Sequence, residues 1–260
     1  MNRIPEKYML SMVKLGRCVD KKLDTYYWFG TGFLIAYERL PGTVFLVTNK
    51  HVIADEEKLS MLFKIKGSSE RKVHEAILWD GSKELWIGHD DPEIDLGIVP
   101  LDRKNLDRNG FDYHAIHTDE ILIHEEMEKY QIGGGAKLYS LCFPVGINSD
   151  EEYPYARTGM ISQIQAYYNN DSSYFIIDMY VFPGNSGGPV FVVLQDDGNP
   201  PVKVTKLIGV ARAFLTYVEE AVSIQTNKTR ITFEDNAGLA SVELAYNLLK
   251  ILKEYKKDTK

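Results

Sequence analysis

The chain is 260 residues long and carries 30 basic and 37 acidic side chains, which gives a formal net charge of −7 at pH 7. This length buries a substantial core in either two small domains or one large one. The acidic balance argues against a protein whose main partner is a nucleic-acid backbone. No stretch is long and apolar enough to span a membrane, and residues 1–7 lack the apolar centre of a signal peptide. We therefore expect a cytoplasmic protein that does not contact a membrane.

The first informative element is an apolar, β-branched strand over residues 44–48 that leads into His51, followed by the apolar pair Val52 and Ile53. This setting predicts that His51 lies at a strand end inside the fold. The other five histidines lie among charged residues: His74, His89, His114, His117 and His124. The last three fit no metal-ligand spacing, so we interpret their segment as a solvated surface face or loop and expect no metal.

Asp95 opens the next apolar run, which covers residues 96–101 and reads as a core strand. The nearby carboxylates Asp90, Asp91 and Glu93 precede that run and are expected to be more solvated. Taken alone, Asp95 would be interpreted as a turn or strand-start cap. Beside His51, it becomes a candidate to orient the imidazole.

The second half of the chain is β-rich and is preceded by a polar, charged segment at 102–130, which predicts either one short helix or an added hairpin. Turn signals separate the apolar runs that follow, and their spacing predicts a barrel. The runs cover residues 137–143, 160–167, 174–181, 189–194 and 202–213.

The stretch 183–189, Pro-Gly-Asn-Ser-Gly-Gly-Pro, places Ser186 among glycines that allow close backbone approach. A serine nucleophile needs a tight turn, nearby N–H donors for an oxyanion, and a base to take its proton. Gly184 and Ser186 are the natural N–H donors, His51 the base and Asp95 its orienting carboxylate. On its own, the stretch is equally compatible with an ordinary loop.

Apolar residues recur at helical spacing over 239–252, which predicts a closing C-terminal helix. We therefore divide the chain into an N-terminal barrel at 1–120 with His51 and Asp95, a second barrel at 121–237 with Ser186, and a helix and tail at 238–260.

The order and setting of these segments resemble the chymotrypsin-type (trypsin-like) serine peptidases, most closely their disulfide-free bacterial, HtrA-like branch. The matching segments are Gly30-Thr31-Gly32-Phe33, Thr48-Asn49-Lys50-His51-Val52, Asp95-Leu96-Gly97-Ile98-Val99 and the stretch around Ser186, and the likeness runs from about Gly30 to Asn247. The resemblance implies an all-β fold of two six-stranded antiparallel β-barrels with a C-terminal α-helix. It also implies a serine endopeptidase that acts on protein or peptide substrates without a cofactor.

Several features refine this expectation. Asn185 stands where zymogen-activated members have an aspartate, so we do not expect activation by N-terminal cleavage. The chain ends soon after its last helix, so we expect no PDZ domain, and regulation would fall to a protein partner, a loop rearrangement or oligomerisation. The two cysteines, Cys18 and Cys142, agree with a reducing compartment, although a bridge between them stays open.

Two alternatives to an active peptidase remain. One is a pseudo-protease that keeps the fold as a protein-binding module, which the intact His51, Asp95 and Ser186 disfavour. The other would use the glycines at 133–135 as a phosphate loop, but the segment lacks the Gly-Lys-Ser/Thr ending and precedes a strand.

The resemblance also implies where substrate specificity is set. It places Tyr180 near the base of the primary pocket, although Tyr180 is also compatible with packing inside the barrel. It places Arg212, Ala213 and Phe214 on the substrate-pairing strand. With no acidic residue at the base, and Ala211 where glutamyl-specific members have a histidine, we expect a preference for small or apolar residues.

Overall fold

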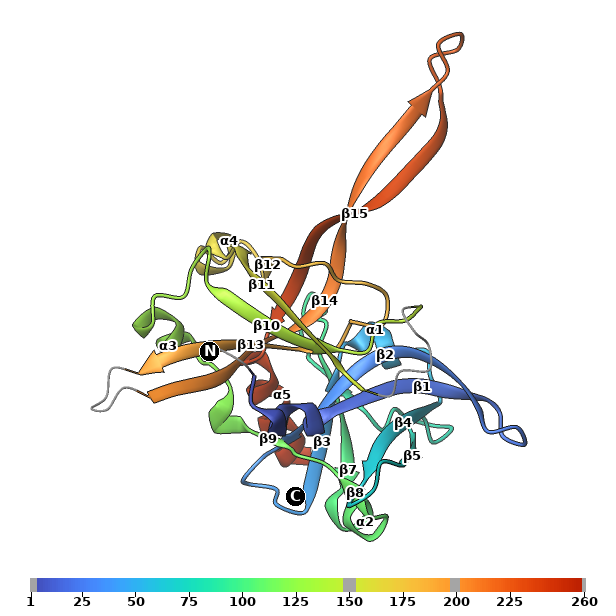
Figure 1. Ribbon diagram of the computed structural model, residues 1–260, viewed down its shortest axis with the longest axis vertical. Coiled ribbons are helices and arrows are strands. Elements are labelled where there is room, and N and C mark those ends of the chain that lie inside the picture. Colours follow the sequence, from blue (N-terminus) through green and yellow to red (C-terminus); the bar gives the residue numbers. More distant parts are fainter. Residues whose placement is uncertain (1–3, 147–152, 197–201, 259–260) are drawn as a thin grey trace.

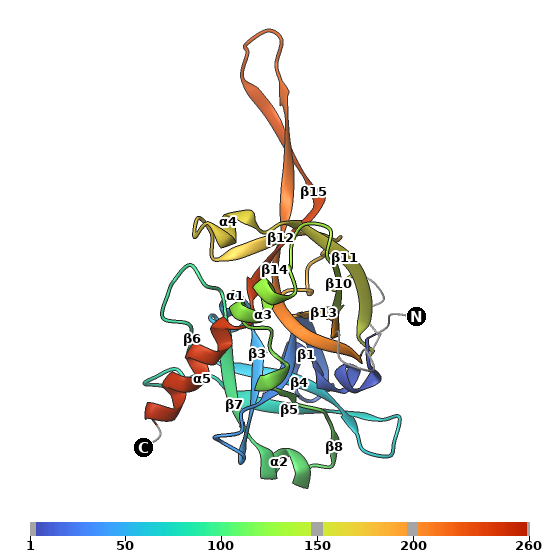
Figure 2. The same ribbon diagram turned by 90° about the vertical axis from the view of Figure 1, so that its left-hand side faces the viewer.

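The computed structural model describes residues 4–146, 153–196 and 202–258, and it consists largely of β-strands. Two β-units lie side by side, a C-terminal helix packs against them, and a long hairpin projects from the second unit (Figures 1 and 2). The expected all-β architecture with two antiparallel units and a C-terminal helix is confirmed.

The N-terminal unit is a sheet whose hydrogen-bonded path runs β5-β4-β1-β2-β3-β7-β6, with β8 on β4 and β9 on β2. Strands β3 and β7 and the second half of β2, residues 30–36, are almost continuously buried because apolar clusters cover both faces of the sheet. The strands are β1 (Met12–Asp20), β2 (Thr25–Ala36), β3 (Thr43–Thr48), β4 (Lys58–Ile65), β5 (Arg71–Ile77), β6 (Ile87–Gly88), β7 (Gly97–Asp102), β8 (Phe111–Asp112) and β9 (Ile116–His117).

This unit departs from the expected six strands, because nine strands pair in the described part of the chain. Two of them come from the polar segment 102–130, which forms neither a single helix nor a separate hairpin. Phe111 and Ile116 are buried, and their short strands attach to the first sheet. The rest of the segment forms α2 (Arg103–Arg108), the 3₁₀ turn η2 (Thr118–Glu120) and α3 (His124–Lys129).

The second unit is a closed six-stranded barrel, as the spacing of the apolar runs predicts. Its order is β10-β11-β12-β15-β14-β13, and each neighbouring pair is antiparallel. The strands are β10 (Lys137–Cys142), β11 (Tyr155–Gln163), β12 (Tyr174–Asp178), β13 (Pro189–Asp196), β14 (Val202–Val222) and β15 (Thr229–Leu244).

The C-terminal helix begins later than the sequence pattern indicates. Residues 239–244 belong to β15 and pair with β12 and β14, so α5 covers Asn247–Asp258 and the barrel extends past 237. Val242 and Leu244 fit both a helical and a strand spacing of apolar residues. They form a strand because this segment pairs with β12 and β14 in the barrel. The remaining elements are η1 (Glu6–Ser11), α1 (Lys50–Ile53) and α4 (Gln165–Tyr168).

Three apolar clusters hold this architecture together. One fills the first unit and another fills the barrel. The third lies between the units, where Phe33 of β2, Phe191 of β13 and Leu248 of α5 are all buried in one cluster. The helix therefore covers the junction of the two units, and strands β2 and β13 are anchored against packed core there.

Thr31 of β2 provides the polar link across this junction. Its backbone N–H donates to the Ser186 carbonyl at 3.1 Å, and its Oγ1 donates to the Gly184 carbonyl at 2.6 Å. The same Oγ1 accepts the Phe143 N–H at 2.8 Å, and the side chain is fully buried. One hydroxyl in the first unit thus fixes two loops of the second.

Replacing Thr31 with valine should destabilise the protein by about 2–5 kcal/mol, because it leaves the Gly184 carbonyl and the Phe143 N–H buried without a partner. Thr31→Ser keeps the hydroxyl and should cost about 1 kcal/mol for the lost methyl group. Urea unfolding of both variants measures this difference. Equal stability of the two would contradict the role of the hydroxyl.

Candidate functional site

His51 and Asp95 are brought together by the register of two neighbouring strands. In the β3–β7 pair, Thr48 lies opposite Gly97. Because the strands are antiparallel, the residues that follow Thr48 approach those that precede Gly97. Asn49 strengthens the approach, since its Nδ2 donates to the Asp95 carbonyl at 2.7 Å.

The His51–Asp95 contact is a two-point hydrogen bond. His51 Nδ1 lies 2.6 Å from Asp95 Oδ2, and the His51 backbone N–H donates to Oδ1 at 3.1 Å. The carboxylate favours the tautomer with a proton on Nδ1, which leaves the lone pair of Nε2 as a base. Among the nearby carboxylates, Asp95 is the one that meets the imidazole, whereas Asp90 pairs with Lys250 of α5.

One detail of the histidine differs from expectation. His51 lies in the short helix α1 rather than at a strand end, and half of its side chain is exposed. Val52 and Ile53 supply the buried face of that helix. The ring is therefore anchored through its backbone and its Nδ1 edge, while the rest of it remains accessible.

Ser186 follows a tight turn formed by Phe182, Pro183, Gly184 and Asn185. The Asn185 N–H donates to the Phe182 carbonyl at 3.0 Å, and Gly184 has a φ of +88°. Proline followed by glycine at a positive φ is the pattern of a type II turn. A Cβ at Gly184 would also lie 2.7 Å from the Phe143 carbonyl oxygen, so both the backbone angle and the space require glycine.

This turn fixes the direction of two N–H groups. The Pro183 carbonyl accepts from the Val145 N–H at 2.8 Å, and a trans peptide directs the Gly184 N–H the opposite way. Within the described part of the chain, neither the Gly184 N–H nor the Ser186 N–H has a hydrogen-bond acceptor. Two neighbouring unpaired donors form a feature that an oxyanion can use.

The Ser186 hydroxyl donates to the Arg212 carbonyl at 2.9 Å. Among the described residues, no hydrogen bond joins it to His51. The loop nevertheless lies against the His51 side of the site, because a Cβ at Gly187 would collide with Thr48 at the end of β3. The structure thus brings the three predicted residues into one region, with the serine hydroxyl bonded to the Arg212 carbonyl.

Arg212 connects the serine to the aspartate. Its Nε lies 3.8 Å from Asp95 Oδ2, and its Nη1 donates to Glu243 Oε1 at 3.0 Å. The Asp95 N–H also donates to Glu243 Oε1, at 3.2 Å. Arg212 is expected on the substrate-pairing strand, but its side chain faces these carboxylates.

Glu243 of β15 was missed from the sequence because its segment reads as helix. It is fully buried, and among the described residues its Oε2 has no hydrogen-bond partner. Burial raises the pKa of Glu243 to about 7, and the nearby Asp95 charge adds to this, while the Asp95 N–H and Arg212 oppose it. The signal in the sequence was a lone carboxylate between Val242 and Leu244.

The other residues expected to bind substrate lie at the start of the projecting hairpin or beside it. Tyr180 is 60% exposed, so packing inside the barrel is wrong for it. Its ring stacks on Phe182 and borders Gly238. Ala213 is exposed on β14, and Phe214 packs against the barrel core.

Asn185 directly precedes Ser186 in the chain and is 1% exposed. Within the described residues, neither polar atom of its amide has a hydrogen-bond partner. The position therefore offers no charge for a new N-terminus to pair with.

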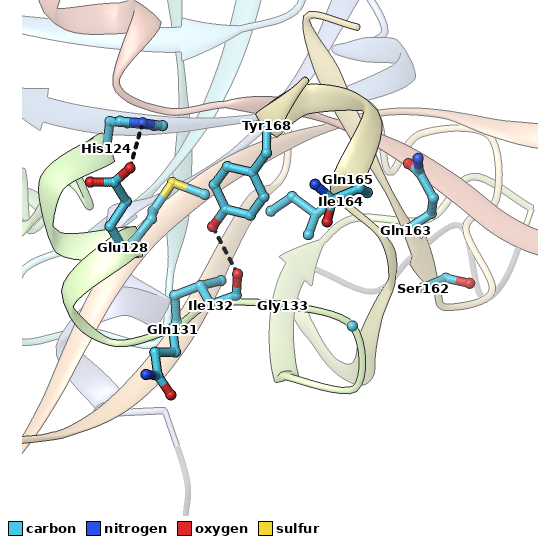
Figure 3. Close-up of a pocket in the computed structure, with 12 residues that line it drawn as sticks. His124, Glu128, Gln131, Ile132, Gly133, Ser162, Gln163, Ile164, Gln165 and Tyr168 are labelled. Atoms are coloured by element: carbon cyan, nitrogen blue, oxygen red, sulfur yellow. Dashed lines mark hydrogen bonds and ion pairs between the residues drawn. The ribbon is translucent and has the colours of Figure 1, made fainter. Parts of the chain in front are cut away.

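A cavity of about 720 Å³ lies elsewhere, and Figure 3 shows it between α3, α4 and the loop at 131–134. His124 pairs with Glu128 at its rim, and the Tyr168 hydroxyl donates to the Ile132 carbonyl. None of the three predicted catalytic residues lines it, and its side chains include no nucleophile paired with a base. We therefore assign it no chemistry.

Several further properties bear on the class of protein. Cys18 and Cys142 are both free, and burial raises the pKa of Cys142 to about 11. Over the described ranges, no group of three metal-ligating side chains gathers. No helix in these ranges is long and apolar enough to cross a membrane.

Two antiparallel β-units, with a histidine–aspartate pair on one and a serine loop on the other, define a protein of chymotrypsin-like fold. A family of trypsin-like peptidase domains matches residues 30–198. Since this match covers more than half of the chain, the protein belongs to the trypsin-like peptidase family.

Other comparisons add little. No curated protein matches the chain. Among solved structures, 167 chains match. One is the apo form of the MamO protease domain from Magnetospirillum magneticum, which is 10% identical, has a TM-score of 0.47, and aligns over 94% of this chain and 97% of that one. This similarity alone assigns nothing to the protein.

Glu243 predicts a specific pH dependence of stability. The folded protein holds this proton up to about pH 7, whereas the unfolded chain loses it near pH 4.5. Because the pKa of Glu243 is higher in the folded protein than in the unfolded chain, its contribution to the free energy of unfolding is present at low pH. That contribution is lost as the pH rises through the pKa of the folded state. From pH 5 to 8, Glu243→Gln should therefore gain about 2–3 kcal/mol in unfolding free energy relative to wild type.

Chemical denaturation at several pH values measures this relative gain. The exposed Glu38→Gln serves as a matched control and should keep a constant difference from wild type. A constant difference for Glu243→Gln as well would show that Glu243 does not titrate in this range.

Proposed function

We propose that the protein is a serine endopeptidase that cleaves peptide bonds through His51, Asp95 and Ser186. One observation carries the proposal: a histidine oriented by an aspartate at 2.6 Å lies in the same region as a serine whose turn presents two unpaired N–H groups. Family membership supports a peptidase, and the residues fit its chemistry without a metal or a cofactor.

In the proposed reaction, His51 Nε2 takes the Ser186 proton as Oγ attacks the peptide carbonyl. Asp95 holds the imidazole in the required tautomer and stabilises the imidazolium that forms. The Gly184 and Ser186 N–H groups hold the oxyanion. The imidazolium then protonates the leaving amine, and water hydrolyses the acyl-enzyme with His51 again as the base.

The hydrogen bond from Ser186 to Arg212 defines a resting state in this scheme. To react, the hydroxyl must leave the Arg212 carbonyl and turn towards His51. A substrate backbone N–H can compete for the same carbonyl, so substrate binding itself would release the nucleophile. A protein partner that orders this region would act in the same direction.

The second candidate function is a pseudo-protease that serves as a protein-binding module. The observation in its favour is that the serine bonds Arg212 in place of His51. Both functions share the fold, so a reaction at the serine separates them.

A fluorophosphonate probe should label the wild-type protein covalently, because it requires an activated serine and a formed oxyanion site. Ser186→Ala should not react, and His51→Ala should lose at least about a hundredfold in labelling rate. Gel fluorescence and intact-mass spectrometry give the readout. Absence of labelling in folded wild-type protein, with or without peptide present, would favour the binding module.

We further propose a preference for small or apolar residues at the cleaved bond. Tyr180, expected near the pocket base, carries no charge to pair with Lys or Arg, and desolvating an unpaired cation is costly. Mass-spectrometric mapping of cuts in a diverse peptide library tests this expectation. Cleavage mainly after Lys or Arg would refute it.

We also propose that the protein acts in the cytoplasm as a processing or effector protease. Both thiols are free, which agrees with a reducing compartment.

A further inference from the structure

The feature without a role in this reaction is the projecting hairpin, residues 215–236 of β14, β15 and their connection, which we call the arm. Figures 1 and 2 show it extending far beyond the barrel. Isolated two-stranded hairpins are only marginally stable in water. An arm of this length therefore suggests a surface that becomes covered during function.

The arm offers an unpaired strand edge. β13 pairs with β14 only from Val202 to Val210, whereas β15 stays paired with β14 out to Val222. Within the described residues, the other edge of β14 is therefore open from Arg212 to Val222. Such an edge can accept an extended chain as an added strand.

This open edge begins at the candidate nucleophile. Arg212 marks its first position, and its carbonyl is the acceptor of the Ser186 hydroxyl. A polypeptide paired antiparallel to β14 would run from the arm tip towards Ser186. Its residues on the N-terminal side of the cleaved bond would then lie along the arm, over about 33 Å for ten residues.

Exposed apolar side chains line the two strands of the arm and its connection. On the strands they are Tyr217, Val218, Val222, Ile231 and Phe233, and in the connection Ile224. The register places them next to acidic residues, since Tyr217 pairs with Asp235 and Val218 pairs with Glu234. Each face of the ribbon therefore combines apolar and acidic side chains.

Four exposed acidic residues make the half of the arm nearer the barrel negative. They are Glu219, Glu220, Glu234 and Asp235, and no ion pair engages them among the described residues. The two basic residues, Lys228 and Arg230, lie nearer the tip. A chain that lies along the edge of β14 would gain from positive charge on the half that approaches Ser186.

We propose that the arm binds polypeptide substrates by β-strand addition to the open edge of β14, and that its acidic side chains select segments with basic residues on the N-terminal side of the cleaved bond. This inference rests on the proposed function, since it names the substrate class of the same site. The apolar side chains of the arm pack against the residues that alternate with the basic ones.

Continuity with Ser186 favours substrate over a second copy of the chain as the occupant. A second copy laid along the arm in the same direction would bring like charges together. A second copy in the antiparallel direction would place the tip of one arm beside the barrel end of the other. It would also cover the open edge of β14 next to Ser186. The two occupants differ in their effect on oligomeric state, which makes them separable.

The test is a binding measurement with the full-length Ser186→Ala protein, so that no cleavage occurs. The probe is a fluorescein-labelled peptide pool of about fourteen residues, the length that spans Arg212 to Val222 with the cleavage position. Its upstream residues alternate Lys and Val, and its last four are randomised. The control pool carries Glu in place of each Lys, and fluorescence anisotropy gives both affinities.

We expect the Lys pool to bind at least about tenfold more tightly than the Glu pool. A shortened arm, with residues 219–233 replaced by Asn-Gly to close the Val218–Glu234 pair, should lose that binding. The set Glu219→Gln, Glu220→Gln, Glu234→Gln and Asp235→Asn keeps the backbone and should remove the preference for Lys. Thermal unfolding verifies that both variants fold.

Equal affinity for the two pools, or unchanged binding by the shortened arm, overturns the proposal. Sedimentation of the intact protein as a dimer that the shortened arm abolishes, without peptide binding, assigns the arm to a second copy instead. Because binding is measured without the nucleophile, failure of Ser186 to react with fluorophosphonate would refute catalysis and leave this result standing.

Discussion

The junction of the two β-units depends on Thr31. Its hydroxyl and backbone N–H form hydrogen bonds with Gly184, Phe143 and Ser186 of the second unit. The apolar cluster that contains Phe33 and Phe191 is buried between the two units. Apolar packing is not directional, so it cannot by itself set a serine at a given place. The buried Thr31 hydroxyl fixes the positions of the Gly184 carbonyl and the Phe143 N–H, because leaving either group without a hydrogen-bond partner would cost free energy. The candidate site therefore exists only when both units fold and dock.

The sequence predicted those parts of the site that depend on local pattern. An apolar run before His51, another after Asp95 and a glycine-rich turn around Ser186 each carry their own signal. The β3–β7 register and the pairing of Arg212 with Glu243 do not, because they join residues far apart in the chain. Local periodicity also failed at residues 239–244, where apolar residues fit a helix as well as a strand and the barrel neighbours decide.

Two neighbouring carboxyl groups and one arginine lie beside His51, and their charges bear on which carboxyl holds a proton. Asp95 and Glu243 share Arg212 as their cation. One guanidinium cannot fully compensate the negative charges of a partly buried and a fully buried carboxyl, so the fully buried one is best kept protonated. Glu243 fits that description, since it is fully buried and its Oε2 lacks a partner among the described residues.

The β3–β7 register has a consequence for chain length. Two residues, Asn49 and Lys50, separate Thr48 from His51, and one, Leu96, separates Asp95 from Gly97. A single inserted residue in either gap would turn the His51 or Asp95 side chain away from its partner, because each added residue changes the direction in which the following side chains point. Length variation is thus forbidden at these two places, whereas the connection at the far end of the β14–β15 hairpin can lengthen or shorten without moving either residue.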